Sequence, residues 1–122
     1  MARIEALARF GALPGGGVTR PCWSEHHEAA RAWLLDEIRG AGLTAWVDPA
    51  GNVFGALGAG AIRADAPVVL TGSHIDTVPE GGILDGALGV LAGLEAIQAI
   101  REGGGTCRRP LAVAAWSDEE GR

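Results

Sequence analysis

Aromatic residues, cysteines and clustered positive charges are all scarce in this sequence of 122 residues. Aromatic side chains make up 5% of the chain, and tyrosine is absent. The two cysteines, Cys22 and Cys107, form no CxxC pair, so we expect two reduced thiols rather than a disulfide or a metal site. Adjacent arginines occur only at positions 108 and 109, which is too short a run for a nucleic-acid-binding stripe.

Long apolar runs are missing as well, since none approaches the roughly 20 residues that a membrane-spanning helix needs. Residues 1–5 mix charged and apolar side chains and lack the apolar stretch of a secretory signal. We therefore expect a cytoplasmic protein whose partners include neither nucleic acid nor membrane. No Gly-x-Ser-x-Gly motif and no glycine fingerprint between a buried strand and a helix is present, which argues against a serine nucleophile and against nucleotide binding.

The composition favours a folded domain, or part of one, because 48% of the residues are hydrophobic and 20% are charged. A helix is predicted over residues 25–39, with Ser24 as its N-cap and a buried stripe at Ala30, Trp33, Leu34 and Ile38. The adjacent His26 and His27 are expected to be exposed at its start. Residues 43–47 and 52–56, joined by a turn-forming segment, predict a hairpin.

A strand at residues 68–70, a helix at 86–102 that is apolar almost all round, and a strand at 111–116 form a predicted βαβ unit. Such a unit has parallel strands, and ligands bind beyond the carboxyl ends of such strands. The segments after residues 70 and 116 should therefore meet at one rim of an α/β sheet. Gly89 and Gly93, four residues apart, indicate a close approach of the helix to a neighbour.

One imidazole and several carboxylates fall in these two segments. His74 can bind a metal, and Asp76, two residues on, can accept a hydrogen bond from the other ring nitrogen. Asp85 has two oxygens with which to bridge two ions. Of Glu119 and Glu120, which face different ways in an extended chain, one can bind metal and the other can act as a general base.

Each of these residues also has an ordinary structural explanation. An isolated His-x-Asp pattern rarely binds metal, an aspartate before a helix is usually an N-cap, and an acidic run after a strand is usually a solvated loop. The coincidence of all three at one predicted rim favours the metal site.

The segments GSHIDTVPEGGILDGALGVLAGLEAI and WSDEEGR resemble the hydantoinase/carbamoylase family of amidases, within the M20 metallopeptidase superfamily. The segments PGGGVTRPCWSEHHEAARAWL and AGLTAWVDPAGNVFG are similar to the same family, so the resemblance covers nearly the whole chain. It implies a partial three-layer α/β/α zinc-peptidase-like catalytic domain with a mostly parallel sheet.

The resemblance also implies two divalent metal ions, Zn or Mn. It assigns His74 and Glu120 as ligands, Asp85 as the bridging ligand, Glu119 as the general base, and Asp76 as the residue behind His74. A cis peptide bond is expected after Asp85, as in relatives from the superfamily.

Family members are several times longer than 122 residues. We therefore expect residues 1–122 to be the amino-terminal part of the catalytic domain, without the further histidine ligands and the dimerisation or lid domain of a homodimeric protein. Such a chain should bind metal weakly and be inactive alone. The implied activity is hydrolysis of C–N bonds in linear ureido or carbamoyl compounds. The alternatives are an M20-type aminopeptidase or deacylase, and a non-catalytic remnant of the fold.

Overall fold

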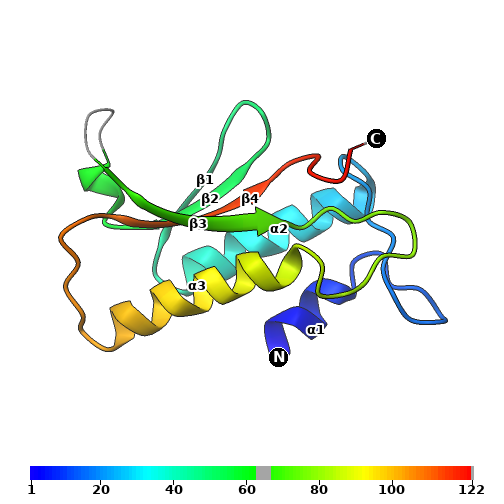
Figure 1. Ribbon diagram of the computed structural model, residues 1–122, viewed down its shortest axis with the longest axis horizontal. Helices are drawn as coiled ribbons and strands as arrows, with labels where there is room; N and C mark the ends of the chain where they lie inside the picture. Colours follow the sequence, from blue (N-terminus) through cyan, green and yellow to red (C-terminus); the bar gives the residue numbers. More distant parts are fainter. Residues whose placement is uncertain (63–66, 122) are drawn as a thin grey trace.

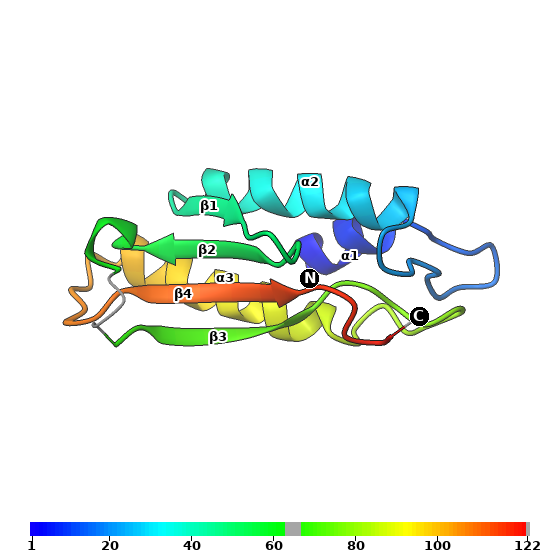
Figure 2. The same cartoon turned by 90° about the horizontal axis from the view of Figure 1, so that it is seen from above.

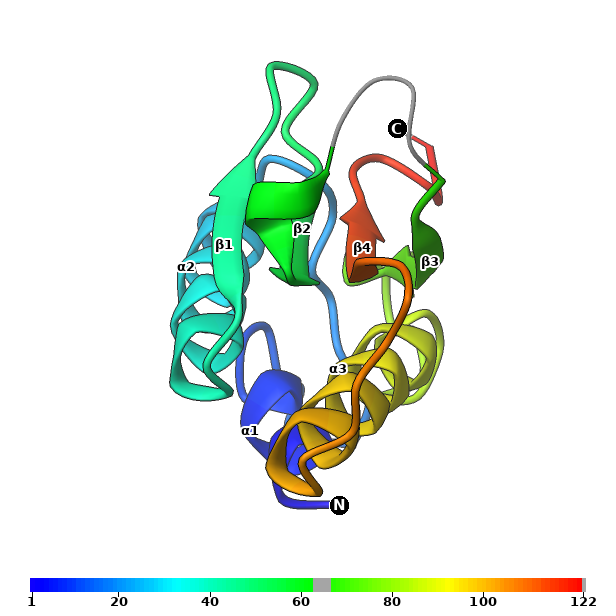
Figure 3. The same cartoon turned by 90° about the vertical axis from the view of Figure 1, so that its left-hand side faces the viewer.

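In the computed structural model, the chain folds into a mixed sheet with helices packed against one of its faces (Figures 1 and 3). The structure describes residues 1–62 and 67–121. In chain order the elements are α1 (Ala2–Ala8), α2 (Glu25–Gly40), β1 (Thr44–Val47), β2 (Val53–Leu57), the short 3₁₀ turn Ala59–Ala61, β3 (Val69–His74), α3 (Ala87–Glu102) and β4 (Leu111–Trp116). In the described residues, no helix is both long and apolar enough to cross a membrane.

Helix α2 forms as the sequence predicts. The Ser24 hydroxyl accepts a hydrogen bond from the backbone N–H of His27 at 3.2 Å, so the N-cap is confirmed. Ala30, Leu34 and Ile38 are buried toward the sheet. The prediction for His27 is wrong, because this side chain is 1% exposed and belongs to the same buried stripe, whereas His26 is exposed.

The strand order is β1-β2-β4-β3, so β4 lies between the hairpin and β3 (Figure 2). Strands β3 and β4 are parallel, as the βαβ prediction requires. The β1–β2 and β2–β4 pairs are antiparallel, so the α/β class is confirmed while the sheet is mixed rather than mostly parallel. The short turn of the hairpin forces only the β1–β2 pair to be antiparallel, since a parallel pair needs a long crossover. Helices cover one face in the described residues, which accounts for two of the three expected layers (Figure 3).

Helix α3 packs closely on β3 because two of its glycines face the strand. A Cβ on Gly89 would lie 2.7 Å from Ser73 Cβ, and a Cβ on Gly93 would lie 2.7 Å from Thr71 Cγ2. The predicted close approach is therefore confirmed. The helix is not buried all round, because Leu88 is 52% exposed.

Two elements differ from the sequence prediction, one in its boundary and one because it was not predicted. Strand β3 continues to His74, although the strand was expected to end at residue 70. Helix α1 was not predicted, and Arg3 anchors it through hydrogen bonds of 2.8 Å to Glu37, Glu95 and Gln98. The partners of Arg3 lie in α2 and α3, far along the chain, so no local sequence pattern predicts these contacts.

Candidate metal centre

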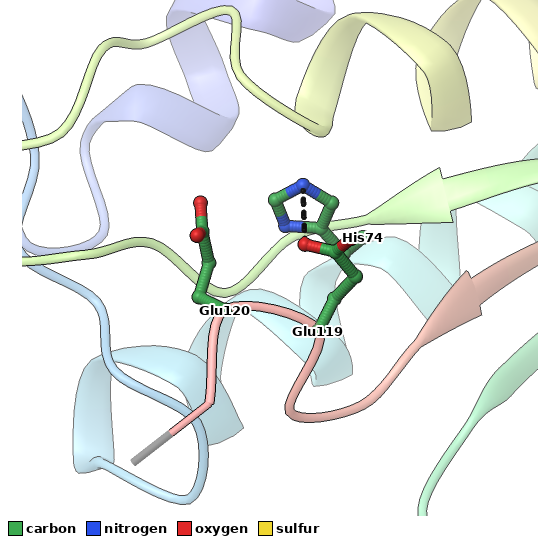
Figure 4. A group of neighbouring side chains, drawn as sticks. All are labelled: His74, Glu119 and Glu120. Atoms are coloured by element: carbon green, nitrogen blue, oxygen red, sulfur yellow. Dashed lines mark ion pairs between the residues drawn. The ribbon is translucent and has the colours of Figure 1, made fainter.

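His74 is the last residue of β3 and lies at the rim where the sequence places it. Its parallel partner in β4 is Trp116, so the loops that leave the two strands run side by side. His74 Nε2 lies 3.4 Å from Glu119 Oε2 (Figure 4). The same nitrogen lies 3.9 Å from Asp85 Oδ1. The imidazole is largely buried, whereas the Asp85 and Glu119 side chains are 62% and 52% exposed.

The structure brings the predicted metal and acid residues together. One potential ligand atom from each of His74, Glu119 and Glu120 lies within 4.8 Å of the others, and Asp85 borders this group through His74. Both glutamates lie on the side of their loop that faces His74 (Figure 4). They do not face apart as expected for an extended chain, because residues 117–120 bend and Asp118 has a φ of 60°.

Asp76 is buried behind the imidazole, but its contacts differ from those expected. The ring nitrogen His74 Nδ1 lies 3.0 Å from the backbone oxygen of Asp76 and 3.7 Å from the carboxylate Oδ1. The other carboxylate oxygen, Oδ2, accepts a hydrogen bond from the backbone N–H of Glu120 at 3.1 Å. Among the described residues, Oδ1 has no hydrogen-bond partner. Asp76 therefore links the two loops of the centre.

The donor set fits a divalent metal ion. In the tautomer that carries its proton on Nδ1, His74 donates to the Asp76 carbonyl and directs the Nε2 lone pair at the acidic side chains. A carbonyl that accepts from the second ring nitrogen orients a metal-binding imidazole, and the unpartnered buried Oδ1 of Asp76 lies 3.7 Å from the same nitrogen. Imidazole and carboxylate together suit Zn or Mn.

Gly86 leaves room for the His74 imidazole because it has no side chain. It has a φ of 61°, and a Cβ on this residue would lie 2.5 Å from His74 Nε2. It is also the N-cap residue of α3, where no side chain caps the helix, so the N-cap explanation for Asp85 is not supported. No peptide bond between the described residues is cis, so the expectation of a cis bond after Asp85 is wrong.

Sequence reasoning missed the buried polar residues beneath the centre. Arg20 is 2% exposed, and burial lowers the pKa of its guanidinium to about 10, which the nearby Asp76 partly offsets. Burial also lowers the pKa of His27 and raises the pKa of the Cys22 thiol. The three-residue spacing between His27 and Ala30 on the helix could have predicted that His27 is buried. The Gly/Pro-rich loop before Arg20 has no such periodicity, so no local pattern predicts the burial of Arg20. Both cysteines are free thiols, as predicted.

Comparison with known proteins agrees with this fold. The family model for peptidase family M28 matches residues 52–121. The chain belongs to this family, of the M28/M20 type, whose members are typically metal-dependent.

The N-carbamoyl-L-amino acid amidohydrolase of Geobacillus stearothermophilus is 42% identical over 119 residues, which cover 98% of this chain and 29% of that protein. The allantoate amidohydrolase of Bacillus subtilis is 40% identical over 118 residues, covering 97% and 28%. This chain thus spans less than a third of the length of these relatives.

A solved hydantoinase/carbamoylase family amidase from Burkholderia ambifaria superposes with a TM-score of 0.88 at 40% identity, covering 96% of this chain and 28% of that one. A putative amidohydrolase/peptidase from Burkholderia cenocepacia gives a TM-score of 0.91 at 40% identity, covering 99% and 29%. The resemblance to hydantoinase/carbamoylase amidases that the sequence motifs indicate is therefore confirmed.

Proposed function

We propose that the whole protein is a metal-dependent hydrolase that cleaves C–N bonds of linear ureido or carbamoyl amides, of the N-carbamoyl amino acid or allantoate type. The observation that carries this proposal is the convergence of His74, Asp85, Glu119 and Glu120 on one rim. The relatives support the substrate class, because they include amidohydrolases of carbamoyl amino acids and of allantoate.

In this proposal His74 and Glu120 would be ligands of divalent ions, Zn or Mn, and Asp85 would be the ligand that two ions share. When bound, such ions polarise the carbonyl of the scissile bond. Asp76 orients His74 through its backbone oxygen and holds the Glu120 backbone through its carboxylate. Glu119 takes a proton from the attacking water and delivers it to the leaving nitrogen, for which its exposed carboxylate is free to turn.

The proposed chemistry has a specific product signature. Hydrolysis of a terminal carbamoyl group adds water across the C–N bond and yields the free amine, carbon dioxide and ammonia. Hydrolysis of a peptide bond yields a carboxylate and an amine without ammonia. Ammonia release therefore separates a ureido hydrolase from a peptidase.

We further propose that residues 1–122 are the amino-terminal part of the catalytic domain of a cytoplasmic homodimer. Further histidine ligands and a dimerisation or lid domain then belong to the rest of the protein. On this basis the 122-residue chain alone binds metal weakly and is inactive. Calorimetry of the isolated chain with Zn²⁺ tests this, since tight binding of two ions would contradict it.

A peptidase or deacylase activity is the second candidate, and the match to peptidase family M28 favours it. The test is ammonia release by the metal-loaded whole protein over a panel of allantoate, N-carbamoyl amino acids and dipeptides. Ammonia from a ureido substrate that disappears on chelation supports the first proposal. Dipeptide cleavage without ammonia from ureido compounds supports the second, and inactivity across the panel supports a non-catalytic remnant of the fold.

A further inference from the structure

Arg20 is a buried cation whose side chain joins α1 to the loop that follows β3. Its Nε donates a hydrogen bond of 2.7 Å to the backbone oxygen of Ile75, and its Nη1 donates to the backbone oxygens of Leu7 and Phe10 at 2.9 and 2.8 Å. Burying a guanidinium is costly, and hydrogen bonds to three carbonyl groups compensate for that cost.

The backbone of Arg20 holds the same loop one residue beyond Asp76. The N–H of Arg20 donates to the Thr77 hydroxyl at 2.8 Å, and the N–H of Thr77 donates to the backbone oxygen of Arg20 at 3.0 Å. Thr77 is 4% exposed, so water does not compete for these bonds. Residues 75 and 77 are therefore both fixed by Arg20, and the chain between them is fixed at both ends.

Asp76 is the residue held between these two attachment points. Its backbone oxygen faces His74 Nδ1, and its carboxylate accepts from the backbone N–H of Glu120. A displacement of this one residue would therefore disturb two of the proposed ligands. The hydrogen bonds of Arg20 to Ile75 and Thr77 oppose such a displacement.

We propose that Arg20 is a positioning residue for the metal centre, which it aligns by holding Asp76 between Ile75 and Thr77. The inference rests on the proposed function, because it requires His74 and Glu120 to bind metal. Lysine cannot replace arginine here, since a single ammonium group has no planar fork to reach the Ile75 oxygen and the oxygens of Leu7 and Phe10 together.

The competing explanation is that Arg20 only anchors α1 through Leu7 and Phe10. Arg3 provides a matched control for this explanation. It anchors the same helix, its side chain is 18% exposed, and its hydrogen bonds go to side chains of α2 and α3 rather than to the loops of the centre. Loss of either arginine should loosen α1, but only loss of Arg20 should disturb the ligands.

The experiment compares Arg20→Lys and Arg3→Gln in the whole natural protein. Zn²⁺ affinity is measured by competition with a chromophoric chelator, and thermal unfolding is measured on the metal-free forms. We expect Arg20→Lys to bind Zn²⁺ about tenfold or more weakly. We expect Arg3→Gln to lower the melting temperature while leaving the affinity unchanged. Equal Zn²⁺ affinities in Arg20→Lys and in the wild type would overturn the inference.

Thr77 keeps the inference testable if the Arg20 variant does not fold. Thr77→Val removes the hydroxyl that accepts from the Arg20 N–H, while Thr77→Ser retains it. We expect weaker Zn²⁺ binding in Thr77→Val and near wild-type binding in Thr77→Ser, and equal affinities would overturn the inference. Failure of the wild type to bind Zn²⁺ would overturn the proposed metal site and this inference together. Wild-type binding with unaffected variants would overturn the inference alone.

Discussion

The Asp76 carboxylate accepts a hydrogen bond from the backbone N–H of Glu120, with 3.1 Å between Oδ2 and the nitrogen. The two residues lie 44 positions apart in the sequence and come from the loops after β3 and β4. Since Asp76 is 1% exposed, water does not weaken this bond. The positions of His74, through the Asp76 backbone oxygen, and of Glu120, through the Asp76 carboxylate, therefore depend on the same buried residue.

Replacement of Asp76 should therefore weaken metal binding more when the acceptor of the Glu120 N–H is lost than when it is kept. Asp76→Ala removes the acceptor of the Glu120 N–H, and we expect metal affinity to fall by about 10–100-fold. Asp76→Asn keeps an oxygen in the same place and should have a smaller effect. Chelator competition on the whole protein measures both affinities, and equal losses in the two variants would contradict this role of the hydrogen bond.

The two adjacent glutamates should separate into two phenotypes. Glu119→Gln keeps a polar side chain but cannot accept a proton, so we expect the rate of hydrolysis to fall by about 10²–10⁴-fold with metal content retained. Glu120→Gln should lose metal instead. Metal analysis of each purified variant, alongside its kcat, distinguishes the outcomes. Loss of metal in Glu119→Gln with full metal in Glu120→Gln would reverse the assignment.

Gly86 should be intolerant of any side chain. An added Cβ would lie 2.5 Å from His74 Nε2, and a backbone at φ 61° and ψ −49° is strained for an L-residue. We expect Gly86→Ala to lower activity by about a hundredfold, because the imidazole must move away from its productive position. Gly82→Ala is the control, since a Cβ added there would meet no described atom within 4 Å. Similar activities in the two variants would show that His74 is not confined by Gly86.

His27 should make stability depend on pH in the acidic range. Burial lowers its pKa, and its Nδ1 accepts a hydrogen bond from the Trp23 N–H at 3.1 Å, which a proton on that nitrogen would break. The unfolded chain takes up a proton near pH 6.5, whereas the folded chain does not, so this contribution to stability is complete above about pH 6.5 and is lost as the pH falls below it.

Thermal unfolding of the metal-free protein between pH 5 and 7 measures this effect. The wild type should lose stability toward pH 5, and His27→Gln should show a shallower dependence on pH. His26→Gln, at the exposed neighbouring position, should keep the wild-type slope. A His27→Gln slope as steep as that of the wild type would contradict the assignment of the acid sensitivity to His27.

The sequence predicts those parts of the fold that local chemistry determines. The Ser24 cap, the apolar spacing of α2 and the run in β4 each mark an element whose observed bounds agree with the predicted bounds to within a few residues. The order in which strands pair is not local. Nothing near residues 53–57 shows that β2 pairs with β4, so the mixed character of the sheet could not be read from the hairpin alone.

The same distinction applies to the candidate site. His74, Asp85, Glu119 and Glu120 could be placed at one rim because parallel strands end on the same side. The orientation of His74 and Glu120 depends on Asp76, and the place of Asp76 depends on Arg20, which lies 55 residues from its Ile75 contact. Such a long-range hydrogen bond leaves no pattern in the neighbouring residues.

Anomalous diffraction from crystals of the whole protein soaked with Zn²⁺ tests the central claim most directly. We predict an anomalous peak about 2.0–2.2 Å from His74 Nε2 and within bonding distance of an Asp85 oxygen. We also predict a second peak about 3.5–4 Å away on the other side of that carboxylate. Zn²⁺ bound elsewhere, with no peak at His74, would contradict the assignment of this rim as the metal centre.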